Sequence, residues 1–308
     1  MRIVFIDPLN LSGEQIRRIK AMGDTTFYSS PPQTDQELID RLSDNDIAVV
    51  NWVTLPDKII DKVKGNLKYL IIPYVGYDWV DVGAAKNKGI RVLNSPNQST
   101  DAVANFTIAL LFALTRKIVV ASLDIRNGFW RPQHFTGVEL SSKTIGVIGY
   151  GRIGKRVADI ARSLGMIVLW ANSTTSIKDL EQIISSSDVV TLHVSYKKTA
   201  GYVLDAKRLR SMKKGSYIIN TSRGSLINES VLLEQLRNGH LAGVALDVLT
   251  TEPLDYTSQM GVALKDKYNL IITPHMAFNT LETDIRRGEE LILNIQSCIH
   301  NKPVNVVN

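Results

Sequence analysis

Three glycines at a fixed spacing are the first residues of the chain that point to a binding chemistry. Gly149, Gly151 and Gly154 form a G-x-G-x-x-G pattern between the apolar run 145–148 and the stretch 155–164, where apolar residues recur with a helical period. Where a strand passes into a helix, such glycines permit a tight turn, a close approach of a pyrophosphate and close helix packing. The pattern predicts a dinucleotide site; the alternative is a turn whose glycines only pack tightly.

Three polar residues beyond later strands can supply the remaining chemistry. Arg223 can grip a carboxylate with its planar guanidinium, and His275 can exchange a proton near neutral pH. Glu252 can orient His275 and favour its imidazolium form. Taken singly, each residue has a purely structural interpretation: Arg223 as a surface ion pair, His275 as a cap and Glu252 as a loop charge. Together, at the ligand-facing ends of strands, they favour hydride transfer between a nicotinamide and a secondary alcohol.

Two series of alternating strands and helices must position these residues. Apolar runs predict strands of a first α/β unit at 2–6, 47–51, 69–73 and 89–94, and of a second at 145–148, 167–170, 188–193, 217–220, 243–247 and 270–273. The alternation predicts doubly wound parallel sheets, in which ligands bind beyond the carboxyl ends of strands. Residues 102–128 predict one long helix, apolar on all sides in its first half and therefore buried. The run 283–299 predicts a last helix that returns to cover the first unit.

Composition restricts the function classes. The chain has 308 residues, 44% hydrophobic content and a net charge of +6, without a signal-peptide pattern or an apolar run long enough to span a bilayer. We therefore expect a cytoplasmic protein that has neither a membrane nor a nucleic-acid partner. The single cysteine, Cys298, excludes an intrachain disulfide and a cysteine-based metal cluster; we expect it in the core, and we expect no metal. Seven basic residues between Lys197 and Lys214 form either a solvated face or a weak steering field for anions.

The residues after the second strand of the nucleotide-binding unit leave the cofactor open between NAD and NADP. An acidic residue is expected there to bind the ribose diol of NAD, but the chain has Asn172, Ser173 and Thr174. Asn172 can bond a ribose hydroxyl, whereas Ser173 and Thr174 can bond a 2′-phosphate. No arginine stands in this loop, and Lys178 is the nearest cation.

Four motifs in order resemble the D-isomer-specific 2-hydroxyacid dehydrogenases, and the resemblance covers nearly the whole chain. They are Gly149-x-Gly151-x-x-Gly154, Asn220-Thr221-Ser222-Arg223-Gly224, Leu246-Asp247-Val248 with Glu252-Pro253, and Thr273-Pro274-His275. Two further segments, Val75-Gly76-Tyr77-Asp78 and Gly89-Ile90-x-Val92-x-Asn94, match the family's substrate-domain signatures. The resemblance implies two Rossmann-like domains: a discontinuous substrate domain of residues 1–98 and 280–308, and a dinucleotide-binding domain of residues 99–279. It also implies a homodimer formed through the helix after Asn97.

The resemblance implies a role for each matching residue. Arg223 would bind the substrate carboxylate and carbonyl, His275 would be the acid/base assisted by Glu252, and the amides of Val75 and Gly76 would hold the carboxylate. Asp247 would bond the nicotinamide carboxamide. The cofactor-binding residues that we predict are Gly149, Gly151, Arg152, Ile153, Gly154, Asn172, Ser173, Thr174, His193, Thr221 and Asp247.

Three positions depart from the family's pattern. Asn172 replaces the usual Asp, Asn105 stands where many members have Glu, and Tyr74 is bulkier than is common beside the substrate loop. The substrate also stays open among glyoxylate, hydroxypyruvate, pyruvate and 3-phosphohydroxypyruvate, and Arg131 keeps a phosphorylated acid among the candidates.

Three functions compete at this point. The leading one is an NAD(P)-dependent oxidoreductase for a small D-2-hydroxy acid or 2-oxo acid. The second is a non-catalytic NAD(H)-sensing protein such as the corepressors that share this fold, which the intact Arg223, Glu252 and His275 disfavour. The third uses the same nucleotide unit for formate or phosphite.

Overall fold

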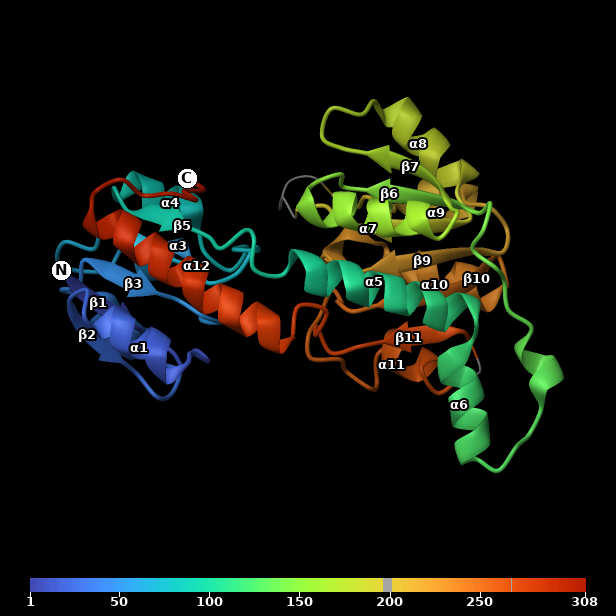
Figure 1. Ribbon diagram of the computed structural model, residues 1–308, viewed down its shortest axis with the longest axis horizontal. Helices are drawn as coiled ribbons and strands as arrows, with labels where there is room; N and C mark the ends of the chain where they lie inside the picture. The colour runs from blue at the N-terminus through green and yellow to red at the C-terminus, as the bar shows by residue number, and fades with distance from the viewer. Residues whose placement is uncertain (196–200, 267) are drawn as a thin grey trace. The chain divides into compact units, whose positions relative to one another are not determined.

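The chain folds into two compact units, described here in a computed structural model for residues 1–195, 201–266 and 268–308. Unit 1 comprises Met1–Ser99 and Asn279–Asn308, and unit 2 comprises Thr100–Phe278. Figure 1 shows the last helix, α12 (Leu281–Ile299), in red beside the blue N-terminal strands of unit 1. The end of the chain thus returns to the unit in which it begins.

Unit 1 is a five-stranded parallel sheet with helices around it. The strand order is β2-β1-β3-β4-β5. The strands are β1 (Arg2–Phe5), β2 (Asp24–Phe27), β3 (Ile47–Val49), β4 (Tyr69–Ile71) and β5 (Arg91–Leu93). The helices are α1 (Gly13–Lys20), α2 (Asp35–Leu42), α3 (Asp57–Ile60), α4 (Val82–Asn87) and α12. Apolar residues of α12 pack with Ile3, Phe5 and Ile47 of the sheet in one core that includes Cys298, as expected.

Unit 2 is a six-stranded parallel sheet in the order β11-β10-β9-β8-β6-β7. The strands are β6 (Thr144–Ile148), β7 (Ile167–Ala171), β8 (Val189–Leu192), β9 (Ser216–Asn220), β10 (Leu241–Leu246) and β11 (Leu270–Ile272). The helices are α5 (Thr100–Thr115), α6 (Ile118–Arg126), α7 (Arg152–Ser163), α8 (Ile177–Ser186), α9 (Ala206–Ser211), α10 (Glu229–Arg237) and α11 (Gln259–Ala263), with short 3-10 turns η1 (Pro132–Phe135) and η2 (Gly224–Leu226). The predicted α/β class with two parallel sheets is confirmed.

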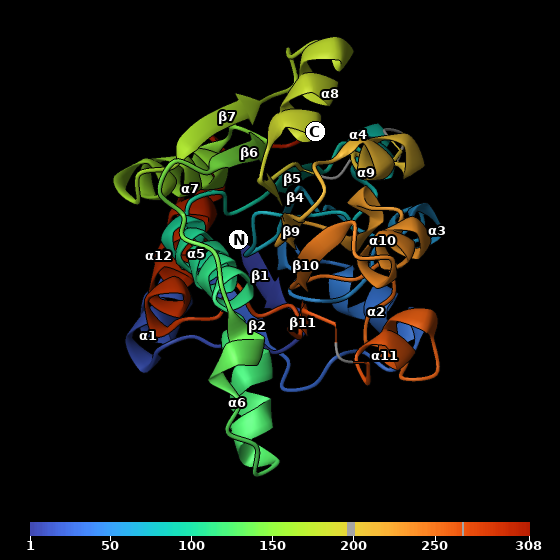
Figure 2. The same cartoon turned by 90° about the vertical axis from the view of Figure 1, so that its right-hand side faces the viewer.

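The prediction of one long buried helix over 102–128 is wrong. The chain breaks at Lys117, which adopts a left-handed backbone with φ 54°, and α5 and α6 meet at 63°. α5 is buried along much of its length, whereas α6 has no buried residue and projects away from the sheet of unit 2 in both views (Figures 1 and 2). Apolar periodicity alone did not distinguish a core helix from its exposed continuation.

Two further observations concern the extent of the elements. The edge strand β2 was not predicted, because its sequence Asp-Thr-Thr-Phe is short and half-exposed and lacks the apolar run of a buried strand. Among the described residues, no single helix has both the length and the apolar character required to cross a membrane; α5 and α6 reach them only when joined across their bend.

Candidate active site

The glycine-rich turn joins β6 to α7 as the sequence predicts. Gly149 has φ 103°, and a Cβ there would lie 2.4 Å from the carbonyl carbon of His193. A Cβ on Gly154 would lie 2.1 Å from the Gly149 carbonyl oxygen. A Cβ on Gly151, the N-cap of α7, meets no atom within 4 Å. Gly149 and Gly154 are therefore required because no Cβ fits at either position. Gly151, between them, leaves the backbone open at a helix N-terminus. Open amides at that position fit a pyrophosphate.

His275 and Glu252 form a hydrogen-bonded pair within unit 2. His275 Nδ1 and Glu252 Oε2 are 2.8 Å apart, so Nδ1 is the ring nitrogen that faces the carboxylate. Burial tends to raise the pKa of Glu252, but the His275 hydrogen bond, the Leu249 N–H and the Arg223 charge outweigh it and lower that pKa. A carboxylate held ionised beside an imidazole fixes the orientation of the ring.

A buried carboxylate holds the turn that carries His275. Asp247, the residue after β10, is 1% exposed and accepts hydrogen bonds from Thr273 Oγ1 at 2.6 Å and from the N–H groups of Met276 and Ala277 at 2.9 Å. His275 itself has a left-handed backbone with φ 51°, an uncommon conformation for a residue with a Cβ. Asp247 therefore fixes the backbone turn that positions His275. The sequence did not suggest this role for Asp247.

Arg223 follows β9 in a turn that Asn220 closes. The fully buried Asn220 side chain donates to the Arg223 carbonyl at 2.8 Å and accepts the Ser222 N–H at 3.0 Å. Both contacts are to backbone, so a side-chain amide at the strand end sets where Arg223 leaves the sheet. Asn220 belongs to the motif quoted for this segment, but its spacing gave no sign of this function.

The loop after β7 is closed on itself. Asn172 Oδ1 accepts the Thr174 N–H at 2.9 Å, the Thr174 hydroxyl at 2.8 Å and the Thr175 hydroxyl at 3.3 Å. Because a backbone N–H can only donate, the amide atom facing it is the oxygen. The Asn172 oxygen is therefore occupied within the loop, and the Asn172 amide NH2 is the group that remains for a ligand.

His193 and Thr221, two other predicted cofactor residues, each lie within hydrogen-bond distance of a threonine hydroxyl. His193 lies beyond β8, with its Nε2 3.0 Å from the Thr191 hydroxyl, and burial lowers its pKa to about 3, which leaves it neutral. The Thr221 hydroxyl lies 3.1 Å from that of Thr107 on α5. Arg152 and Ile153 are the first residues of α7.

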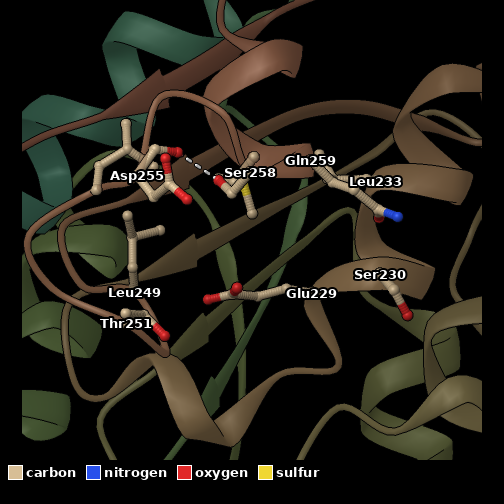
Figure 3. A pocket seen from close by; sticks show the side chains of 10 residues that line it. Glu229, Ser230, Leu233, Leu249, Thr251, Asp255, Ser258 and Gln259 are labelled. Carbon is tan, nitrogen blue, oxygen red and sulfur yellow. Dashed lines mark hydrogen bonds between the residues drawn. The ribbon is translucent and has the colours of Figure 1, made fainter.

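Two pockets border the segment that carries Glu252. The histidine pocket, of about 620 Å³, is lined on its polar side by Asp247, Glu252 and His275 and elsewhere by apolar residues that include Leu249 and Leu254. The Glu229 pocket, of about 320 Å³, is lined by residues of α10, of α11 and of the segment 249–255, and again includes Leu249 and Leu254 (Figure 3).

The predicted substrate loop of unit 1 offers backbone donors. The carbonyls of Tyr74 and Val75 accept hydrogen bonds from Ser95 N–H and Asn94 Nδ2, both at 2.9 Å. Among the described residues, the N–H groups of Val75 and Gly76 donate to no protein acceptor. Donors of this kind beyond a strand end can bind an anion.

An aromatic cluster adjoins this loop. The rings of Trp52 and Tyr74 lie 4.6 Å apart, Trp79 lies 5.7 Å from Trp52, and Trp52 is 51% exposed. Burial raises the pKa of Tyr74 to about 12, so its hydroxyl stays protonated. The bulky Tyr74 is thus a buried support for an exposed indole.

Other predicted positions lie apart from these groups or have local partners. Arg131 pairs with Asp124 and stacks on Phe129, which weakens the case for a phosphate ligand there. Asn105 is exposed on α5. Of the basic cluster, Lys197 and Lys198 lie outside the described residues, while Lys207 and Lys213 form ion pairs with Glu181 and Asp188.

Comparison with known proteins decides the family. A family model described as the D-isomer specific 2-hydroxyacid dehydrogenase, NAD binding domain, matches residues 108–277. A glycerate dehydrogenase of Methylorubrum extorquens is 33% identical over 99% of this chain and 98% of its own length. The chain belongs to the D-isomer-specific 2-hydroxyacid dehydrogenase family.

Other relatives of this dehydrogenase are equally complete matches. A hydroxypyruvate reductase of Blautia hydrogenotrophica is 33% identical over the whole of both chains. Among solved structures, an acyclic imino acid reductase in complex with NADPH and D-Arg matches with a TM-score of 0.92 and 35% identity over the whole of both chains. The predicted enzyme class, an oxidoreductase acting on CH–OH groups with a nicotinamide cofactor, is confirmed. Nothing in these comparisons supports the corepressor alternative.

Proposed function

We propose that the protein reduces a small 2-oxo acid to the D-2-hydroxy acid, with Arg223, His275 and Glu252 as its catalytic residues. The observation that carries the proposal is the 2.8 Å contact between His275 Nδ1 and Glu252 Oε2, which orients the imidazole beside a carboxylate. When bound, the nicotinamide supplies the hydride. Arg223 binds the substrate carboxylate and polarises the carbonyl, and His275 donates its Nε2 proton to the carbonyl oxygen as C2 is reduced.

The amides of Val75 and Gly76 are proposed to bind the substrate carboxylate. Their N–H groups have no protein acceptor among the described residues, while the carbonyls of Tyr74 and Val75 are engaged. Residues 1–98 with 280–308 would then form the substrate domain, and residues 99–279 the dinucleotide-binding domain.

The cofactor that we propose is NADP(H). The glycine-rich turn supports a dinucleotide, with Gly149, Gly151, Arg152, Ile153 and Gly154 at the pyrophosphate. The described loop after β7, residues 172–176, contains no carboxylate that would repel a 2′-phosphate. The Asn172 oxygen is also occupied by its own loop, so it is a poor acceptor for a ribose diol. The imino acid reductase with NADPH points the same way.

The remaining cofactor contacts are proposals of the same kind. The Asn172 NH2 group and Ser173 would donate to the 2′-phosphate, and Thr174 would orient Asn172 through its N–H and its hydroxyl. His193 and Thr221 would line the site, and Asp247 would meet the nicotinamide carboxamide in addition to holding the His275 turn.

The substrate is proposed from the relatives and from unit 1. The names of the relatives make glyoxylate, hydroxypyruvate and 3-phosphohydroxypyruvate the first candidate substrates. Pyruvate is a fourth candidate, because one similar structure is a D-lactate dehydrogenase. The imino acid reductase was solved with D-Arg, and the exposed Trp52 is a flat surface on which a planar side chain can stack. We therefore add phenylpyruvate and 5-guanidino-2-oxopentanoate, the latter also with ammonium to form its imine.

One rate comparison tests the cofactor and the substrate together. NADH and NADPH are each assayed at 340 nm with the six acids, in the natural enzyme and in Asn172→Asp. We expect NADPH to be preferred, and Asn172→Asp to reverse the preference by at least tenfold in kcat/KM, because the new carboxylate accepts from the diol and repels the phosphate. An NADH preference in the natural enzyme would refute the cofactor assignment, and a lack of reduction with every acid would refute the reaction.

A homodimer through α5 and α6 is part of the proposal. α6 exposes Ile118, Val119, Leu123 and Ile125, between 37% and 54%, on a helix without a buried residue. An apolar surface of this kind on a family member favours a second copy as its partner. Sedimentation should give a dimer, and Leu123→Glu with Ile125→Lys should give a monomer. We place the enzyme in the cytoplasm.

A further inference from the structure

The segment that carries Glu252 lies between the two pockets of unit 2. Leu249 and Leu254 line both the histidine pocket and the Glu229 pocket. Both leucines are partly buried and pack against the core of unit 2, whereas Thr250, Thr251 and Glu252 between them are exposed. The two leucines hold the ends of the segment, and the hydrogen bonds at Leu249 and Thr250 hold the exposed part that carries Glu252.

Glu229 makes one of these hydrogen bonds from outside the segment. Its Oε1 accepts the Thr250 N–H at 2.7 Å, while Glu252 Oε1 accepts the adjacent Leu249 N–H at 2.9 Å. Figure 3 shows the Glu229 side chain extending from the start of α10 across the pocket toward Leu249 and Thr251. Asn228 caps α10, and a carboxylate at the first helical residue is favoured by the helix dipole.

Gly224 supports the same segment from the backbone side. A Cβ on Gly224 would lie 1.9 Å from the Leu249 carbonyl carbon and 2.1 Å from the Thr250 nitrogen, so the two backbones are in direct contact. The segment therefore rests on Gly224 and is held in place by Glu229. The pocket beyond Glu229 leaves it room to move if that carboxylate is removed.

We propose that Glu229 is a positioning residue for the His275–Glu252 pair. It fixes the Thr250 N–H, thereby fixes Glu252, and through Glu252 fixes the imidazole that donates the proton. The inference rests on the proposed function, since it assigns Glu229 to the same reaction. In this role Glu229 acts on the reaction only through Glu252.

Kinetics of three variants test this role. We expect Glu229→Ala to lower kcat about tenfold, because small displacements of reacting groups reduce rates strongly, with the KM of the cofactor within twofold. Glu229→Gln should retain activity within twofold, since its amide oxygen still accepts the Thr250 N–H. The matched control is Glu234→Ala, on the same helix, which removes an exposed pair with Arg210 and a hydrogen bond from the neighbouring Gln235 Nε2. Equal rates in Glu229→Ala and Glu234→Ala would overturn the proposal.

A double variant separates positioning from a general structural effect. If Glu229 acts only through Glu252, Glu229→Ala should lower the rate no further once Glu252→Ala is present. Additive losses would overturn the proposal. In proton NMR spectra, the downfield signal of the His275 Nδ1–H hydrogen bond should be lost in Glu252→Ala and weakened in Glu229→Ala. This signal requires no turnover, so it decides the role of Glu229 even if no 2-oxo acid is reduced and the proposed function fails.

Discussion

In both units, a buried aspartate beyond a strand end holds a turn through two backbone N–H groups, but the two turns carry different side chains. In unit 1, Asp7 is 3% exposed and accepts the N–H groups of Asn51 and Trp52, each at 2.8 Å. In unit 2, the equally buried Asp247 accepts those of Met276 and Ala277. A carboxylate that bonds two successive N–H groups fixes a turn without a need for packing. The turn of unit 1 carries the indole of Trp52, whereas the turn of unit 2 carries the imidazole of His275.

The two turns differ in how many additional hydrogen bonds orient the groups that they carry. His275 has a second carboxylate, Glu252, on its ring, and Arg223 leaves a turn closed by Asn220. The backbone donors of unit 1 at Val75 and Gly76 are already oriented by their strand end. Side chains that react must be oriented individually, and in unit 2 the hydrogen bonds of Asn220, Asp247 and Glu252 orient the predicted catalytic residues.

Replacement of His275 should give the largest effect. His275→Gln removes the proton donor but keeps a side chain that can hydrogen bond to Glu252, so kcat should fall about 10³-fold while cofactor affinity is retained. Single-turnover rates and cofactor fluorescence titration measure the two quantities. His240→Gln, outside the candidate site, serves as the control. A near-normal rate in His275→Gln would make another residue the acid.

Replacement of Arg223 should give the next largest effect. Arg223→Lys keeps the charge but loses the bidentate geometry, so kcat/KM for the 2-oxo acid should fall about 10- to 100-fold, the range of one charged hydrogen bond. Steady-state kinetics at saturating cofactor measure it, with the exposed Arg237→Lys as the control. Unchanged kinetics would exclude Arg223 as the carboxylate anchor.

The paired carboxylates can be compared directly. Asp247→Asn removes an acceptor from the His275 turn, so kcat should fall about tenfold, whereas Asp7→Asn loosens a turn without a reacting group and should change kcat less than threefold. Steady-state kinetics and urea unfolding of both variants provide the measurements. Equal effects on kcat would show that the two turns do not differ in function.

The stabilising contributions of His193 in unit 2 and Asp7 in unit 1 should change with pH in opposite directions. His193 has a folded pKa of about 3 against 6.5 for an ordinary histidine, so its contribution to stability is complete above pH 6.5 and is lost as the pH falls toward 3. Burial raises the pKa of Asp7, so its contribution is present at low pH and is lost as the pH rises through that value. Between pH 7 and 5, unit 2 should lose about 2 kcal/mol because of His193.

Hydrogen exchange at the two pH values reports on each unit separately. His193→Gln should remove most of the acid sensitivity of unit 2 and leave that of unit 1 unchanged. If unit 2 stays acid-sensitive in this variant, other groups are responsible.

Most elements of the fold could be predicted from local patterns. The strands β6 and β9 are apolar runs, and the strand-to-helix glycines fix the turn that Gly149 makes with φ 103°. The half-exposed strand β2 could not be predicted, because it lacks an apolar run. The break at Lys117 could not be predicted either, because apolar residues continue on both sides of it. For the site, motifs gave Arg223, Glu252 and His275, but not the roles of Asp247, Asn220 or Glu229.

The sequence by itself determined the residue types that can do chemistry and the strand ends after which they stand, because both depend on neighbours in the chain. Only the tertiary structure decided their partners. Asp247 reaches a turn that begins 26 residues later at Thr273, and Glu229 reaches Thr250, 21 residues away. Such contacts arise when parallel strands bring their carboxyl ends to one edge of a sheet, and no local pattern records which side chain then meets which N–H group.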